Sequence, residues 1–241
     1  MCIRDRDYIL SLEDNFKMQQ LRKERGLKAD SPSMHMIFTG NPGTGKTTVA
    51  RIVSRYLKAI GALSGGQLVE VARADLVGQY VGHTAPLTQK AIQAALGGVL
   101  FIDEAYSLYR GKDDSFGLEA IDTLVKGMED HRADLIVIVA GYTELMGQFI
   151  HANPGLESRF NKYFYFEDYD GAQLMSIFKS MCGKNGYTLD EETEKFAAEL
   201  FTRLYEERDE NFGNARDVRN IFERGVARQS NRVAALESPT K

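Results

Sequence analysis

Short apolar runs alternate with longer amphipathic stretches over the first two thirds of the chain. Apolar runs at residues 35–39, 68–72, 99–102, 134–140 and 162–166 are typical of buried strands. Between the first two runs, apolar residues recur with a helical period, namely Val49, Ile52, Val53, Tyr56, Leu57 and Ile60, and Gly61 ends the helix. A further helix is expected over residues 87–96, stopped by Gly97-Gly98. This alternation predicts an α/β fold with a parallel sheet.

The strand pattern stops after Asp170-Gly171, and the rest of the chain has a helical pattern. Helices are expected near residues 173–181, 191–207 and 215–235, with one apolar face each; the residues on these faces are Phe196, Ala197, Leu200, Phe201, Leu204, Tyr205, Val218, Ile221, Phe222 and Val226. An amphipathic helix over residues 8–27 and a short linker precede the first strand. The expected domains are therefore 1–33, 34–169 and 170–241.

Composition excludes several classes of protein. With 241 residues, 43% hydrophobic content and no apolar stretch near 18 residues, the chain predicts a globular protein without membrane insertion. It has two cysteines and no apolar signal core, which indicates a cytoplasmic protein without a disulfide framework. The net charge of −4 makes nucleic acid an unfavourable main partner, and the four histidines have no metal-ligand spacing.

A glycine-rich turn follows the first strand and carries the strongest chemical signal. Its residues match the eight-position P-loop pattern between a strand and a helix; they are Gly40, Asn41, Pro42, Gly43, Thr44, Gly45, Lys46 and Thr47, with Thr48 next. Glycines let backbone N–H groups converge on phosphate oxygens, and the helix N-terminus favours an anion. Lys46 supplies a charge for the β- and γ-phosphates, and the Thr47 hydroxyl is a ligand for Mg²⁺.

Two carboxylates, Asp103 and Glu104, follow the third apolar strand. Ligands of open α/β sheets bind at the carboxyl ends of parallel strands. Asp103 is therefore expected to hold Mg²⁺ with Thr47, and Glu104 to act as the general base for an attacking water. A whole strand separates the P-loop strand from this acidic strand, an arrangement that favours RecA-like and AAA+ ATPases over nucleoside kinases and switch GTPases.

The combined motifs make the sequence similar to the AAA+ ATPases of the CbbX, CfxQ and stage V sporulation protein K family. The resemblance covers roughly residues 16–232 and lies in residues 35–48, 75–84, 97–106, 153–160 and 212–220. It implies a P-loop NTPase with a five-stranded parallel sheet of order 5-1-4-3-2 and a small C-terminal helical lid. It also implies a ring, usually a hexamer, with ATP sites between protomers. The motifs at residues 163–168 and 212–214 look closer to the sporulation-type members.

The same resemblance suggests four further functional positions. Arg159 matches the arginine finger, which stabilises charge on a neighbouring protomer's ATP. Arg216, with Arg219 one turn later, matches the sensor-2 arginine that reaches from the lid to the nucleotide. Thr143 matches the sensor-1 position at the end of the fourth strand. Tyr80, Val81 and Gly82 match the pore loop that grips an extended peptide, and His83 is a loop residue.

The first six residues depart from the family pattern, where a segment that encloses the adenine normally precedes residue 16. We therefore expect a truncated or artefactual N-terminus. The sequence predicts a Mg²⁺-dependent ATP-hydrolysing motor that assembles into a ring and remodels an unknown protein client. Two alternatives stay open: a slowly hydrolysing, ATP-binding scaffold module in a sporulation or secretion machine, and a clamp-loader-like protein directed to DNA.

Overall fold

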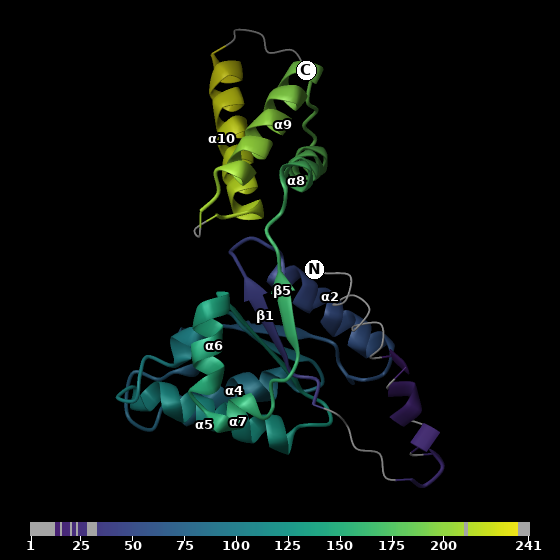
Figure 1. Ribbon diagram of the computed structural model, residues 1–241, viewed down its shortest axis with the longest axis vertical. Coiled ribbons are helices and arrows are strands. Elements are labelled where there is room, and N and C mark those ends of the chain that lie inside the picture. Colours follow the sequence, from purple (N-terminus) through teal and green to yellow (C-terminus); the bar gives the residue numbers. More distant parts are fainter. Residues whose placement is uncertain are drawn as a thin grey trace. The chain divides into compact units, whose positions relative to one another are not determined.

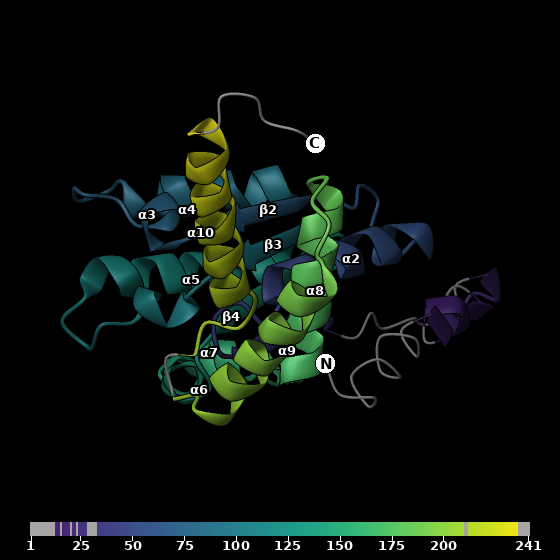
Figure 2. The same ribbon diagram turned by 90° about the horizontal axis from the view of Figure 1, so that it is seen from above.

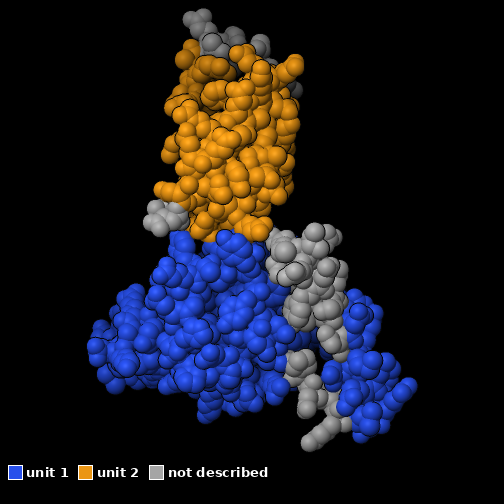
Figure 3. Space-filling view, in the orientation of Figure 1, with its two compact units in different colours: residues 1–40, 46–166 blue, residues 41–45, 167–241 orange. Residues whose placement is uncertain are grey.

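The computed structural model describes residues 13–14, 16–19, 21–22, 24–27, 33–209 and 212–235. It divides into two compact units, coloured separately in Figure 3. The first unit takes in Met1–Gly40 and Lys46–Phe166, and the second takes in Asn41–Gly45 and Glu167–Lys241. The P-loop therefore begins in the first unit, passes through the second and re-enters the first at Lys46.

The first unit is built on one parallel sheet. Its strands are β1 (Met36–Gly40), β2 (Leu68–Val71), β3 (Val99–Ile102), β4 (Ile136–Gly141) and β5 (Tyr163–Phe166). They lie in the order β2-β3-β4-β1-β5, and every neighbouring pair is parallel. Seen from above in Figure 2, β2, β3 and β4 follow one another across the sheet. This order is the expected 5-1-4-3-2 order read from the other edge, so the predicted fold class is confirmed.

Helices cover both faces of the sheet, which explains why β1, β3 and β4 are buried along their whole length and contain no polar side chain except Thr39. The helical elements of the first unit are α2 (Lys46–Ala59), α3 (Arg73–Leu76), α4 (Thr84–Ala95), η1 (Ala105–Leu108), α5 (Ser115–Asp130), α6 (Thr143–His151) and α7 (Pro154–Glu157). Helix α2 lies on one side of the sheet and α4 to α7 lie on the other (Figure 1).

Alternate residues of β1, β3 and β4 enter two separate cores. Met36 and Phe38 pack with Ala50, Val53 and Leu57 of α2 on one face. On the other face, alternate strand residues join residues of α4, α5 and α6; this core includes Ile37, Leu100, Ile102, Val137, Val139, Ile92, Leu124 and Phe149. Truncating one of the buried leucine, isoleucine or phenylalanine side chains in these cores to alanine costs about 2–5 kcal/mol. The period of two along each strand thus fixes which side chains face which helix layer.

Helix α5 is absent from the helices expected from the sequence. Its apolar residues at positions 121, 124 and 128 are buried, and they follow the helical period that identified α2. Asp114 caps its N-terminus by accepting a hydrogen bond from the Gly117 N–H at 3.0 Å. The Asp-Ser pair at 114–115 was therefore an available start signal.

Two apolar residues expected on buried helix faces are exposed instead. Ile52 of α2 is 60% exposed, because Ala50, Val53, Ser54 and Leu57 form the face toward the sheet. Phe196 of α9 (Glu191–Glu206) is 65% exposed. Each lies at the margin of the apolar stripe, where helical periodicity alone does not separate an inward from an outward position.

The second unit contains a bundle of α8 (Gly171–Lys184), α9 and α10 (Ala215–Ala234), in which α8 contacts both other helices. Its core residues are Leu174, Met175, Phe178, Cys182, Ala197, Phe201, Phe212 and Val218. Asp170 starts α8 with a capping box, accepting the Gln173 N–H at 2.8 Å while its own N–H donates to the Gln173 side chain. The three helices expected after residue 170 are thus present.

The N-terminal helix expected over residues 8–27 lies partly outside the described residues, as does most of the linker 28–33. Its described residues are helical at 13–14, 16–19, 21–22 and 24. Phe16 packs on the α2 side of the sheet, and Glu13 accepts a hydrogen bond from the Tyr56 hydroxyl at 3.1 Å. Within the part of the chain that is described, no helix combines the length and apolar character needed to cross a membrane.

Candidate functional site

Strand register brings three expected motifs of the first unit to one edge of the sheet. Thr39 of β1 pairs with Gly141 of β4, and Val139 of β4 pairs with Ile102 of β3. The carboxyl ends of β1, β4 and β3 therefore lie side by side. Lys46 follows the first of these strand ends, Thr143 the second and Asp103 the third, so the polar groups share the edge where open α/β sheets bind ligands.

Gly40 and Lys46 form the first-unit part of the P-loop. Gly40 has φ +138°, and a Cβ there would overlap the Phe166 carbonyl of the adjacent β5, so both the backbone angle and the close packing require glycine. The Lys46 Nζ donates a hydrogen bond to the Gly40 carbonyl at 2.8 Å. The lysine side chain thus folds back over the turn, with its charge at the start of α2.

Thr47 and Thr48 lie in the first turn of α2, where backbone N–H groups have no partner within the helix. Thr47 is half-buried and Thr48 is exposed. No acidic residue occurs in this first turn. The turn therefore keeps the positive end of the helix dipole available for an anion.

The middle of the P-loop is held by side chains of the second unit. Asn41 Nδ2 donates to both carboxylate oxygens of Asp168, at 3.0 and 3.1 Å. The Tyr169 hydroxyl donates to the Thr44 carbonyl at 3.0 Å, and burial raises the pKa of this phenol. Gly43 has φ +71° and lies so close to the Gly213 carbonyl that a Cβ would overlap it.

Asn214 is the centre of this second-unit network. It is completely buried, and its side-chain nitrogen donates to Asp168 Oδ1 at 2.8 Å and to the Pro42 carbonyl at 3.3 Å. Its side-chain oxygen accepts the Tyr169 N–H at 2.8 Å. Sequence reasoning missed all three of these residues as parts of the site, although Asn214 lies inside a motif that carried the resemblance. Asp168 likewise ends the motif at residues 163–168, whereas Tyr169 had no distinguishing local signal.

Asp103 and Glu104 are both exposed beyond the end of β3. Glu104 adopts left-handed backbone angles, φ +48° and ψ +44°. Its N–H donates to Asp103 Oδ1 at 3.1 Å, and its carbonyl accepts the Ser107 N–H at 2.8 Å. Placing a non-glycine residue in this backbone conformation costs a free energy on the order of 1 kcal/mol. Such conformations persist where surrounding contacts hold them, and they cluster at functional sites.

The oxygen donors at this edge fit a magnesium ion chemically. Mg²⁺ prefers hard oxygen ligands and keeps several waters, so one hydroxyl and one carboxylate are a suitable protein contribution. Thr47 and Asp103 provide that pair in the first unit. Asp103 is exposed and uses one oxygen for the Glu104 N–H, which leaves its other oxygen for a hydrated ion.

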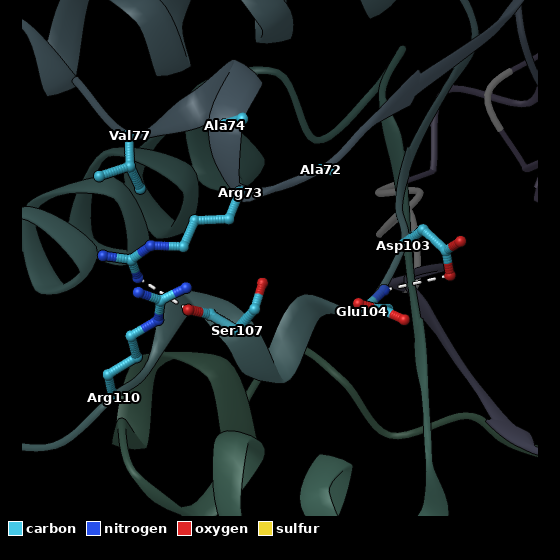
Figure 4. A pocket seen from close by; sticks show the side chains of 8 residues that line it. All are labelled: Ala72, Arg73, Ala74, Val77, Asp103, Glu104, Ser107 and Arg110. Atoms are coloured by element: carbon cyan, nitrogen blue, oxygen red, sulfur yellow. Dashed lines mark hydrogen bonds between the residues drawn. The ribbon is translucent and has the colours of Figure 1, made fainter. Parts of the chain in front are cut away.

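A pocket opens beside the acidic pair, with a volume of about 550 Å³. Asp103 and Glu104 lie on one side of it, and the guanidinium groups of Arg73 and Arg110 lie on the other (Figure 4). Ser107 of η1 lies between them and accepts a hydrogen bond from Arg73. The pocket therefore has an acidic wall and a basic wall, both within the first unit.

Thr143 is the first residue of α6 and is exposed just beyond β4. Tyr142 precedes it, with its ring 6.1 Å from that of Tyr106 in η1. Burial is the largest cause of the raised pKa of Tyr106, and the Glu104 charge adds to it. Thr143 follows the end of β4, which lies between the strand ends that precede Lys46 and Asp103; its role as sensor 1 stays a prediction.

Arg159 follows α7 and is paired within its own chain. Its guanidinium contacts Glu129 at 3.0 Å and donates to the Gly155 carbonyl at 3.1 Å, and the side chain is 24% exposed. Its Nε is buried without a hydrogen-bond partner among the described residues. A pocket of about 240 Å³ lies beside it and is also lined by His35. Within its own chain, Arg159 is therefore held by Glu129 and by the Gly155 carbonyl.

The loop with Tyr80 is exposed but anchored at both ends. Tyr80 is 67% exposed and Val81 is 87% exposed, and Gly82 has φ +82°. Two buried threonines hold the flanks: Thr84 Oγ1 accepts the Gly78 N–H at 3.1 Å, and the Thr88 hydroxyl donates to the Leu76 carbonyl at 2.9 Å. His83 lies beside Tyr80 with ring centres 5.5 Å apart. The exposure fits a contact surface, whereas a self-packed tyrosine would be covered.

Arg216 and Arg219 occupy the first turns of α10 and are exposed. The Arg216 N–H donates to the Gly213 carbonyl at 2.9 Å, in the same segment that contacts Gly43 of the P-loop. The backbone of Arg216 is thus adjacent to the P-loop portion of the second unit. Arg219 lies one turn farther along α10.

Comparison with known proteins adds two family matches and several relatives. Residues 36–168 match the family model described as ATPase family associated with various cellular activities (AAA), and residues 170–241 match AAA lid domain. Stage V sporulation protein K of Bacillus subtilis (strain 168) is 48% identical over 217 residues, which cover 90% of this chain and 67% of that protein. The chloroplastic ribulose bisphosphate carboxylase/oxygenase activase of Cyanidioschyzon merolae is 46% identical, covering 90% and 74%. Protein CbbX of Cereibacter sphaeroides is 44% identical, covering 92% and 71%.

Proposed function

Because the chain belongs to the AAA family of ATPases, we propose that it is a Mg²⁺-dependent motor that assembles into a ring and remodels a protein client. The resemblance drawn from the sequence motifs is confirmed by this membership, and with it the assignment as an ATPase. The observation that carries the proposal is the strand register that brings the P-loop, the acidic pair and Thr143 to one edge of the sheet.

Each group at that edge has a role in ATP hydrolysis. The backbone N–H groups of the P-loop, which Pro42 lacks, bind phosphate oxygens, and the Lys46 ammonium binds the β- and γ-phosphates. Thr47 and Asp103 hold Mg²⁺, which when bound neutralises charge on the phosphates. Glu104 orients the attacking water and accepts its proton, and Thr143 holds that water or the γ-phosphate by a hydrogen bond.

Two arginines extend the site beyond the sheet edge. Arg216 contacts the nucleotide from the lid and transmits its phosphate state, with Arg219 as a second contact. Arg159 acts on the ATP of a neighbouring protomer, where a guanidinium stabilises the charge of the transferring phosphoryl group. Its ion pair with Glu129 then competes with the contact in trans, so the neighbour's nucleotide must draw it away.

The ring is proposed to be a hexamer, as in this family, and the client to be a protein. One relative is named an activase of ribulose bisphosphate carboxylase/oxygenase, a name that denotes action on another enzyme. Tyr80, Val81 and Gly82 provide an exposed aromatic loop for gripping an extended chain. We place the protein in the cytoplasm, since Cys182 is a free, buried thiol that suits a reducing compartment.

The intrachain pairing of Arg159 favours one alternative. A module that binds ATP but keeps its finger paired with Glu129 would hydrolyse slowly and act as a scaffold in a larger machine. The similarity to stage V sporulation protein K is compatible with such a machine in sporulation. The intact Glu104 favours the motor, because a module that only binds ATP does not need a general base.

Substitution of Glu104 by glutamine tests the hydrolytic role directly. The variant should bind ATP as the parent chain does but lose turnover, because the amide cannot accept the proton of water. Glu199→Gln, an exposed change on α9, is the matched control and should hydrolyse normally. Magnesium removal by EDTA should abolish turnover in both the parent and the control. Parent-like turnover by Glu104→Gln would overturn the assignment.

A further inference from the structure

Arg73 is a largely buried arginine that the hydrolytic mechanism above leaves unused. It is the first residue of α3, two positions after the end of β2, and its side chain is 18% exposed. One guanidinium nitrogen donates to the Ser107 carbonyl at 2.7 Å and to Asp114 Oδ2 at 2.7 Å, and the other donates to Asp114 Oδ1 at 3.0 Å. Such a two-pronged pair uses the planar fork that only arginine offers.

These bonds join three segments that are distant in sequence. Ser107 belongs to η1, the turn that begins immediately after Glu104. Asp114 caps α5 through the Gly117 N–H, and it keeps a lowered pKa because Arg73 hydrogen-bonds its charged form. Arg73 itself opens the short helix that leads toward Tyr80. Its guanidinium is therefore the point where these three segments meet.

The turn that Arg73 holds is the one that fixes Glu104. Glu104 has left-handed backbone angles, and such a conformation persists only where neighbouring contacts impose it. Its carbonyl accepts the Ser107 N–H at 2.8 Å, and the Ser107 carbonyl in turn accepts from Arg73. Two consecutive hydrogen bonds thus connect the guanidinium to the backbone of Glu104. Figure 4 shows Arg73 reaching across the pocket wall toward Ser107, with Glu104 beyond.

The other end of α3 is tied to the exposed loop. Leu76, its last residue, is buried, and its carbonyl accepts from the Thr88 hydroxyl. The Gly78 N–H donates to Thr84 on the far side of the loop. These two hydrogen bonds therefore join α3 and the residues after it to the start of α4, on the other side of the Tyr80 loop.

We propose that Arg73 is a positioning residue for Glu104, which holds the turn after β3 in the geometry that water activation requires and links this turn to the Tyr80 loop. This inference rests on the proposed role of Glu104 as the general base. It assigns Arg73 no contact with ATP. Loss of Arg73 therefore affects the hydrolytic step and leaves nucleotide binding intact, because a misplaced base lowers the rate without removing any phosphate contact.

The test compares substitutions in the full chain by steady-state ATP hydrolysis and by binding of a fluorescent ATP analogue. Arg73→Met removes both sets of bonds and should lower kcat by about tenfold or more at an unchanged analogue Kd. Arg73→Lys keeps the charge without the fork and should restore part of that loss. Arg51→Met breaks an exposed ion pair with Glu70 and should change neither quantity, which makes it the matched control.

A second variant keeps the test decisive if Arg73→Met fails to fold. Asp114→Asn retains an acceptor for the Gly117 N–H but gives up the charge that holds the guanidinium, so kcat should fall and analogue binding should not. A parent-like kcat in folded Arg73→Met or Asp114→Asn overturns the inference, as does an equal loss of binding and turnover. Hydrolysis by Glu104→Gln at the parent rate would instead show that the proposed function itself is wrong.

Discussion

Asn214 donates a hydrogen bond to Asp168 Oδ1 at 2.8 Å, and Asn41 of the P-loop donates to the same carboxylate. One carboxylate therefore joins the start of α10 to the phosphate-binding turn within the second unit. Asn214 is completely buried and has φ +51°, a strained backbone angle for a residue other than glycine. The hydrogen bonds of its side chain hold it in this conformation. We therefore expect this network to influence how tightly the P-loop holds a nucleotide.

Replacing Asn214 with alanine should weaken ATP binding by about tenfold, since each hydrogen bond lost is worth about 1 kcal/mol and the Tyr169 N–H is left without its acceptor. Binding of a fluorescent ATP analogue measures the effect. Asn214→Gly removes the same side chain but relieves the backbone strain, so it should bind equally weakly if the side-chain contacts matter. Asn220→Ala on exposed α10 is the control. Parent-like affinity in both Asn214 variants would refute this role.

Sequence reasoning predicted the sheet well because its signals are local. The apolar runs and the P-loop fix β1, β3 and α2 within a few residues, and family resemblance supplied the strand order that periodicity cannot supply. Helix α5 was not predicted, although its buried residues at positions 121, 124 and 128 follow a helical period. Ile52 and Phe196 were wrongly assigned to buried faces, since marginal positions of a helix depend on what packs there.

Contacts between distant segments could not be read from the sequence. Asp168 accepts a hydrogen bond from Asn41, which lies 127 positions earlier in the chain. Arg73 likewise pairs with Asp114, 41 positions later. Neither has a distinguishing spacing, because tertiary packing alone brings the groups together. The intrachain pairing of Arg159 with Glu129 was equally unexpected, since the resemblance implies only its role toward a neighbour.

Arg159→Ala should abolish most hydrolysis, and mixing it with Lys46→Ala should restore part of it. Each variant alone lacks one half of a site, but a mixed ring contains sites with Lys46 from one protomer and Arg159 from the next. ATPase activity across a range of mixing ratios measures this recovery. Arg55→Ala, an exposed change on α2, mixed with Lys46→Ala controls for dilution. No recovery in rings shown to be mixed would contradict a finger acting in trans.

Tyr80→Ala should leave basal hydrolysis nearly unchanged while remodelling of a client protein is lost. The side chain is 67% exposed and lies in a loop that no described nucleotide-site residue contacts through a hydrogen bond, so its removal costs the fold little. Tyr163→Ala, another exposed tyrosine, is the control. The assay follows ATP-dependent unfolding of an added protein substrate. Unchanged remodelling by Tyr80→Ala would exclude the threading role.

Because His35 is buried, the free energy of unfolding of the first unit should decrease as the pH falls. Burial lowers the pKa of His35 from 6.5 to about 4, and the nearby Arg159 and Arg132 charges add to this. The unfolded chain therefore binds the proton first as pH falls below 6.5, and stability decreases until the folded pKa near 4 is reached. The loss from pH 7 to pH 5 is about 2 kcal/mol, at 1.36 kcal/mol per pKa unit.

His35→Asn keeps an acceptor near the position of Nδ1, which accepts the Val137 N–H at 3.0 Å, but it does not titrate. Urea unfolding of both chains at pH 7 and pH 5 isolates the histidine contribution from that of the carboxylates. The parent should lose about 2 kcal/mol more than the variant. An equal pH dependence in the two chains would exclude His35 as its source.

The rate of ATP hydrolysis per protomer, measured against protein concentration with Mg²⁺ present, tests the central claim most directly. A motor whose site is completed by Arg159 of a neighbour should show a rate that rises steeply with concentration and then reaches a plateau as rings fill. The Arg159→Ala variant should stay low at every concentration. A flat, measurable rate in the parent chain would mean that each protomer is complete alone, and the proposed ring mechanism would be wrong.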